Sequence, residues 1–102
     1  MNTQPSPHDP LADLIGEYRR QIVNFTERAP LEDWEALTRD TYGPPLDLLW
    51  HHTPEPNSPA GVLAAMLLAK DEPDLYALES INEACIRYLR REAERAAAAE
   101  AA

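Results

Sequence analysis

The side chains of this chain most able to bind a metal or attack a substrate are few: three histidines and one cysteine. His51 and His52 are adjacent, and adjacent side chains on a helix point about 100° apart, so a helical pair would chelate poorly. In a loop the same pair could bind a metal. The sequence contains no Cys-x-x-Cys or His-Glu-x-x-His motif to support such a site. We therefore expect neither a metal nor another cofactor.

Cys85 is the only possible thiolate nucleophile. It falls on the apolar stripe of a predicted helix, where burial raises the pKa of a thiol and blocks access to it, so we expect a packing residue. The serines lack the Gly-x-Ser-x-Gly context of a nucleophile elbow. We predict no catalytic residue and a protein that is not an enzyme. The alternative is a small ligand-binding protein or enzyme with a site near Tyr42, His51 and His52.

Three aromatic residues, Trp34, Tyr42 and Trp50, surround the run Gly43-Pro44-Pro45. Aromatic side chains with a polar tip serve either as core residues or as anchors of a partner-binding patch. Core packing is the plainer interpretation. If these side chains are exposed, residues 34–52 are the first place to seek an interface.

Acidic residues outnumber basic residues by 18 to 9, which gives a formal charge of −9. This charge repels nucleic-acid phosphates and anionic lipids, so we expect no direct binding of nucleic acid or membrane. It favours a basic protein partner, including one whose nucleic-acid-binding surface the acids would cover. The acids expected to contact such a partner lie around the start of the last predicted helix: Asp71, Glu72, Asp74, Glu79 and Glu83.

The chain shows no sequence feature of export or membrane insertion. Its single cysteine gives no sign of a disulfide framework. The first residues have no apolar signal region, and the longest apolar run, residues 60–69, is too short to span a bilayer. We expect a cytoplasmic protein.

Prolines beside Asp or Ser mark helix starts, because proline fits the first helical turn and the preceding side chain can cap it. Asp9-Pro10 and Ser58-Pro59 have this pattern. Together with the apolar periodicity, they predict helices over residues 10–28, 31–50, 59–70 and 74–97. Gly43-Pro44-Pro45 either splits the second helix or kinks it, and we favour a kink.

Apolar spacing predicts which side of each helix faces the core. In the first helix the stripe is Leu11, Leu14, Ile15, Tyr18, Ile22 and Phe25. In the third it is Val62, Leu63, Met66 and Leu67, and in the last it is Leu75, Leu78, Ile81, Cys85, Ile86 and Leu89. Asn82 falls inside the last stripe, either buried with a partner or at its wet edge.

These elements indicate an all-α, single-domain protein that resembles a four-helix bundle. Residues 1–8 are polar and rich in proline, so we expect a disordered N-terminal tail. Residues 9–97 form the helical domain. Residues 98–102 are alanine and glutamate with nothing large to bury, so we expect a frayed end.

Three short motifs, Glu17-Tyr18-Arg19, Tyr42-Gly43-Pro44-Pro45 and Ser58-Pro59-Ala60-Gly61, precede an alanine-rich apolar helix. In this order they resemble short bacterial and prophage-associated hypothetical proteins. The resemblance covers residues 11–70 and implies a small accessory protein of a mobile element, such as a regulator or inhibitor of host or phage machinery. It implies no catalytic residues.

The sequence therefore favours a non-enzymatic helical module that acts by binding protein, either as a homodimer or as an adaptor. Trp34, Tyr42 and Trp50 join the five acids as its candidate partner-binding residues.

Overall fold

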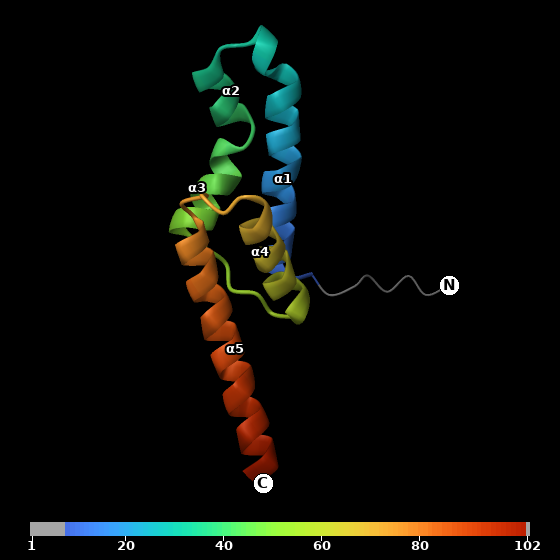
Figure 1. The fold of residues 1–102 in the computed structure, drawn as a ribbon, viewed down its shortest axis with the longest axis vertical. Coiled ribbons are helices and arrows are strands. Elements are labelled where there is room, and N and C mark those ends of the chain that lie inside the picture. Colours follow the sequence, from blue (N-terminus) through green and yellow to red (C-terminus); the bar gives the residue numbers. More distant parts are fainter. Residues whose placement is uncertain (1–7, 102) are drawn as a thin grey trace, which may run out of the picture.

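The computed structural model describes residues 8–101, and within that range the chain is helical with no strand. The predicted all-α class is confirmed. These residues form five α-helices and one short 3₁₀ helix, arranged as in Figure 1. Their bounds are α1 Pro10–Arg28, η1 Ala29–Leu31, α2 Trp34–Asp40, α3 Gly43–His51, α4 Pro59–Asp71 and α5 Leu78–Ala101. Apart from His8, the predicted N-terminal tail lies outside the described residues.

Helix α1 begins and ends where the sequence predicts. Asp9 caps it, because its carboxylate accepts hydrogen bonds of 2.9 Å from the backbone N–H groups of Leu11 and Ala12. Leu11, Ile15 and Tyr18 are buried in the core. The remaining members of the predicted stripe are half-buried.

The kink predicted for the second helix is wrong, because the helix is split. A 3₁₀ turn follows α1, Asp33 then caps the short helix α2, and α3 starts anew at Gly43. A Cβ atom on Gly43 would lie 2.7 Å from the carbonyl oxygen of Thr38, so only glycine lets α3 start this close to the end of α2. Pro44 and Pro45 occupy the first turn of α3, where their missing N–H groups cost little.

The last helix starts later and extends further than predicted. Turns occupy much of residues 72–77, so α5 begins at Leu78 rather than at residue 74. It continues as helix to Ala101, through the segment expected to fray. Every residue from Ala93 to Ala101 is exposed.

Four helices form the bundle around one core. Helix α1 packs against α3 and α4, and α5 packs against the same two helices. The short helix α2 contacts α1 and α3 at one end of the bundle. The C-terminal half of α5 extends beyond the other helices (Figure 1), and the molecule measures 61 × 40 × 21 Å. The core lies where α1, α3, α4 and the first half of α5 meet.

Candidate protein-interaction surface

Helix α4 presents to the core a different side from the predicted one. Its buried residues are Gly61, Ala65 and Leu68, so two of the three are small. Of the four residues predicted to face inward, Val62 is half-buried. The other three are exposed: Leu63 at 57 %, Met66 at 66 % and Leu67 at 47 %. The large apolar side chains of α4 therefore face outward.

The reason lies in the close packing of α4 on the start of α1. A Cβ atom on Gly61 would lie 2.3 Å from Oδ1 of Asp9, so the glycine side of α4 is the side that can approach α1. Because α4 is apolar on nearly every side, hydropathy alone does not select the inward side. The fit of small residues against α1 decides it.

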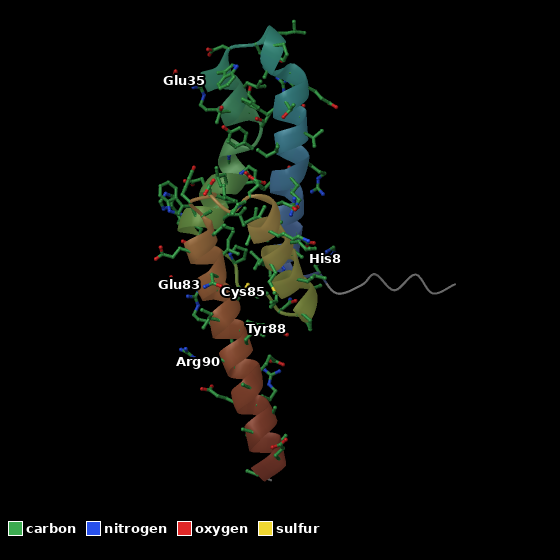
Figure 2. All side chains as sticks on the ribbon, in the orientation of Figure 1. His8, Glu35, Glu83, Cys85, Tyr88 and Arg90 are labelled. Carbon is green, nitrogen blue, oxygen red and sulfur yellow. The ribbon has the colours of Figure 1, made fainter. Side chains whose placement is uncertain are left out.

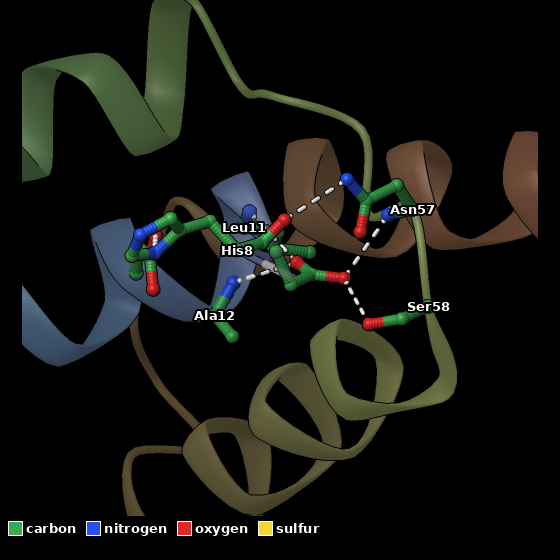
Figure 3. Close-up of polar contacts among 7 residues, drawn as sticks. His8, Leu11, Ala12, Asn57 and Ser58 are labelled. Atoms are coloured by element: carbon green, nitrogen blue, oxygen red, sulfur yellow. Dashed lines mark hydrogen bonds and ion pairs between the residues drawn. The ribbon is translucent and has the colours of Figure 1, made fainter. Parts of the chain in front are cut away.

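Asp9 joins the two helix starts through hydrogen bonds (Figure 3). Besides the two bonds that cap α1, its Oδ2 accepts bonds from the backbone N–H of Asn57 at 3.0 Å and from the hydroxyl of Ser58 at 2.6 Å. Ser58 occupies the N-cap position of α4, but its side chain makes no cap bond, so the predicted cap by its side chain is wrong. Burial favours a raised pKa for Asp9, yet bonds from Ser58, Ala12, Asn57 and Leu11 hold this pKa below its ordinary value.

Helix α5 also faces the core with a different side from the predicted one, and like α4 it leaves large apolar residues exposed. Its buried residues are Ile81, Ala84, Cys85 and Tyr88. Ile86 is 41 % exposed and Leu89 is 50 % exposed, although both were predicted to face inward. For Asn82 the structure supports the wet-edge alternative, since its side chain is exposed.

The thiol of Cys85 is buried in the core, as the sequence predicts. Burial raises the pKa of this thiol, which disfavours the thiolate form.

The outward residues of the two helices flank an apolar groove of about 500 Å³. It is lined by Val62, Ala65, Met66, Ala69, Leu78, Glu79, Ile81, Asn82, Cys85, Ile86 and Leu89. Only two of these side chains, Glu79 and Asn82, are polar. A second hollow of about 400 Å³ continues toward the start of α4, where Leu63, Tyr88 and Glu92 contribute. We call Leu63, Met66, Leu67, Ile86 and Leu89 the α4–α5 surface; Leu67 is exposed one helical turn from Leu63 and lines neither hollow.

Core packing, the plainer interpretation of the three aromatic residues, is wrong for Trp34 and Trp50, which are exposed, and the alternative partner-binding patch is divided between two places. Trp34 is 68 % exposed, and its ring packs edge-on against Phe25 at 5.6 Å between ring centroids. Tyr42 is half-buried, and its ring centroid lies 5.1 Å from that of Phe25, so both Trp34 and Tyr42 pack against Phe25. Trp50 is 43 % exposed and lies 4.5 Å from the ring of Tyr76, at the far end of α3. The three residues do not form one patch.

Two of the five predicted acids are used within the chain. Asp71 forms an ion pair of 3.2 Å with Arg19 of α1. Glu72 is half-buried and accepts a hydrogen bond of 2.8 Å from the hydroxyl of Tyr18. Glu79 of α5 lines the groove, whereas Glu83 is exposed on the same helix and lines neither hollow. Asp74 is exposed in the turn between α4 and α5.

The alternative site near Tyr42, His51 and His52 is not assembled by the fold. Tyr42 precedes the first residue of α3, whereas His51 is its last residue and His52 follows it. None of the three lines either hollow. Among residues 8–101, no three potential metal ligands come together.

Sequence reasoning missed the α4–α5 surface because it treated Leu63, Met66, Leu67, Ile86 and Leu89 as core. One signal was available: the glycine and alanines of α4 lie among large residues with no polar side to oppose them. A helix apolar on all sides needs cover on all sides.

None of the described helices is long and apolar enough to cross a membrane. Comparison with protein-family models, with curated proteins and with solved structures finds no match.

Proposed function

We propose that this chain is a non-enzymatic protein-interaction module that binds an apolar helix against its α4–α5 surface. The observation that carries the proposal is the side that α4 turns toward the core: the helix buries the small residues Gly61 and Ala65 and exposes Leu63, Met66 and Leu67. Large neighbouring apolar side chains left in water mark interaction sites. The groove beside them is lined by residues of two helices and is almost wholly apolar, which suits an amphipathic helix.

The chemistry of the rim supports a helix with basic flanks. Glu79 lies at one end of the groove and Glu92 at the other, and Glu83 is exposed on the same helix. An apolar stripe on the partner would fill the groove, and lysines or arginines beside that stripe would face these acids. This arrangement agrees with the net charge of −9. It also suits a small regulator or inhibitor that acts by covering a surface of its target, the role suggested by the resemblance to prophage-associated proteins.

A photo-crosslinking amino acid placed at position 66 tests the proposal. Irradiation in the cells that make the protein should link it to another polypeptide chain through the α4–α5 surface. The matched control carries the same amino acid at position 35, because Glu35 is exposed on α2, at one end of the molecule and away from α4 (Figure 2). A crosslinked polypeptide at position 66 and not at position 35 supports the proposal. Equal or absent crosslinking at both positions contradicts it.

A further inference from the structure

Most arginines of α5 have an ion-pair partner within the chain, but one does not. Arg87 and Arg91 both contact the carboxylate of Glu55, and Arg95 pairs with Glu92 at 2.8 Å. The two arginines hold the pKa of Glu55 below its ordinary value. Within residues 8–101, Arg90 forms no ion pair, and neither does Glu83.

Glu83 and Arg90 share one face of α5. They are seven residues apart, which is close to two helical turns. Figure 2 shows both side chains on the side of α5 turned away from α4, opposite to Cys85 and Tyr88. Ile86 lies between them along the helix and lines the groove. An acid and a base therefore form the outer rim of the α4–α5 surface, one on either side of Ile86.

Resting on the proposed function, we propose that the occupant of this surface is a second copy of the chain, with the two α5 helices antiparallel about a two-fold axis near Ile86. The symmetry makes the charges complementary. Residues whose numbers add up to about 173 face each other, so Glu83 of each copy meets Arg90 of the other. A parallel pair would instead place Glu83 against Glu83 and Arg90 against Arg90, which is repulsive.

The same axis covers the apolar groove. Met66 lines the groove beside both Ile86 and Leu89, so it lies level with the axis and is buried together with its symmetry mate. The exposed C-terminal part of α5, residues 93–101, is rich in alanine and extends beyond its own bundle. In the antiparallel pair, residues 93–95 face residues 78–80 of the other α5, where Leu78 lines the groove, and residues 96–101 face the turn before that helix. Small side chains permit the two helices to approach closely.

One contact of this arrangement is unfavourable. Glu79 of each copy lies near Glu94 of the other, at the exposed rim. Salt screens this repulsion and the Glu83–Arg90 attraction alike, so both contribute most at low ionic strength.

Charge reversal tests the pairing by sedimentation velocity over a range of protein concentrations, at about 50 mM salt. Glu83→Arg and Arg90→Glu each turn two attractive contacts into two repulsive ones, so each should weaken dimerisation by about tenfold. The combined variant restores both contacts and should return to within about threefold of the wild type. Glu35→Arg is the matched control on α2. Circular dichroism of each variant checks that it folds.

A cysteine pair tests the direction of the helices. Ile86→Cys lies at the axis and should form an intermolecular disulfide under mild oxidation. Ala97→Cys is on the same side of α5 but eleven residues away, so in the antiparallel pair its sulfur atoms lie about 33 Å apart and cannot bond. The native chain, whose buried Cys85 remains, is the control. Efficient crosslinking through position 97 overturns the antiparallel arrangement.

The outcomes separate this inference from the proposed function. A dimer that responds to charge reversal and combined rescue supports the second copy as occupant. A monomer at all concentrations, with a different protein crosslinked at position 66, overturns the second copy and leaves the interaction module supported. A monomer with no crosslinked polypeptide at position 66 overturns both.

Discussion

The hydroxyl of Tyr18 on α1 donates a hydrogen bond of 2.8 Å to the carboxylate of Glu72, the residue that ends α4. Tyr18 is only 2 % exposed, so the bond lies at the edge of the core. Beside it, Arg19 pairs with Asp71 across the same two helices. These contacts set the far end of α4 against α1, while Asp9 and Gly61 set its near end. Held at both ends on α1, α4 presents its large apolar residues outward.

Replacing Tyr18 with phenylalanine removes the hydroxyl and leaves a half-buried carboxylate without its donor. We expect Tyr18→Phe to lower the free energy of unfolding by about 1–2 kcal/mol, since the lost bond involves a charged acceptor. Urea unfolding at fixed protein concentration measures this change. Tyr76→Phe is the control, because Tyr76 is 56 % exposed. Equal losses in the two variants would contradict a structural role for the Tyr18–Glu72 bond.

Tyr18 should also make stability depend on alkaline pH. Burial, and then the bond to Glu72, raise the pKa of Tyr18 above its ordinary value of 10.0. A raised pKa in the folded state means that folding favours the protonated phenol. This contribution is complete below the unfolded pKa and is lost as pH rises above it. The wild type should therefore lose stability more steeply than Tyr18→Phe above about pH 10. Urea midpoints of both proteins from neutral to alkaline pH measure the difference.

Asp9 should give the opposite dependence. Its folded pKa is held below the ordinary 3.8, so its contribution is present above that pH and is lost as pH falls through the folded pKa. Asp9→Asn should lower the free energy of unfolding by about 1–2 kcal/mol at pH 7 and flatten the loss of stability in acid. Asp13→Asn is the matched control on the exposed side of the same helix turn. Thermal unfolding from pH 7 to pH 3 shows whether only the Asp9 variant changes the slope.

The starts of α1 and α4 were predictable because their signals are local. Asp9 before Pro10 marks the start of α1. Ser58 before Pro59 marks the start of α4, although the Ser58 side chain makes no cap bond. The split between α2 and α3 depends instead on the distance between Gly43 and the carbonyl of Thr38, which is set by packing. A kink and a split leave the same proline pattern in the sequence.

The candidate surface was harder to predict than the helices. In α1, polar residues oppose the apolar stripe, so hydropathy identifies the inward side. In α4 there is no such contrast, and the choice between Ala65 and Met66 as the inward residue depends on the space that α1 leaves. Helix α5 packs against α4, so the side of α5 that is buried depends on the position of α4. The exposure of Ile86 could therefore not be predicted from the α5 sequence alone. In the sequence of a single chain, apolar residues of the core look the same as apolar residues that a partner covers.

Two glycines should respond oppositely to replacement by alanine. Gly61→Ala places a Cβ atom on the carboxylate of Asp9, which four hydrogen bonds hold in place, so we expect a loss of about 1–3 kcal/mol despite the gain in helix propensity. Gly16→Ala meets only the end of Arg20, at 3.6 Å, and should stabilise α1 by up to about 1 kcal/mol. Urea unfolding of the two variants measures both changes. A stabilised Gly61→Ala would show that α4 can move away from α1 at little cost.

The orientation of α4 can be tested by truncating one residue on each side of it. Leu68 is fully buried, so Leu68→Ala should lower the free energy of unfolding by about 2–4 kcal/mol. Met66 is 66 % exposed, so Met66→Ala should cost less than about 1 kcal/mol when measured at protein concentrations too low for association. At higher concentrations Met66→Ala should weaken self-association, because the lost side chain belongs to the α4–α5 surface. If Met66→Ala destabilised the dilute protein as much as Leu68→Ala, the large residues of α4 would be core and the surface would not exist.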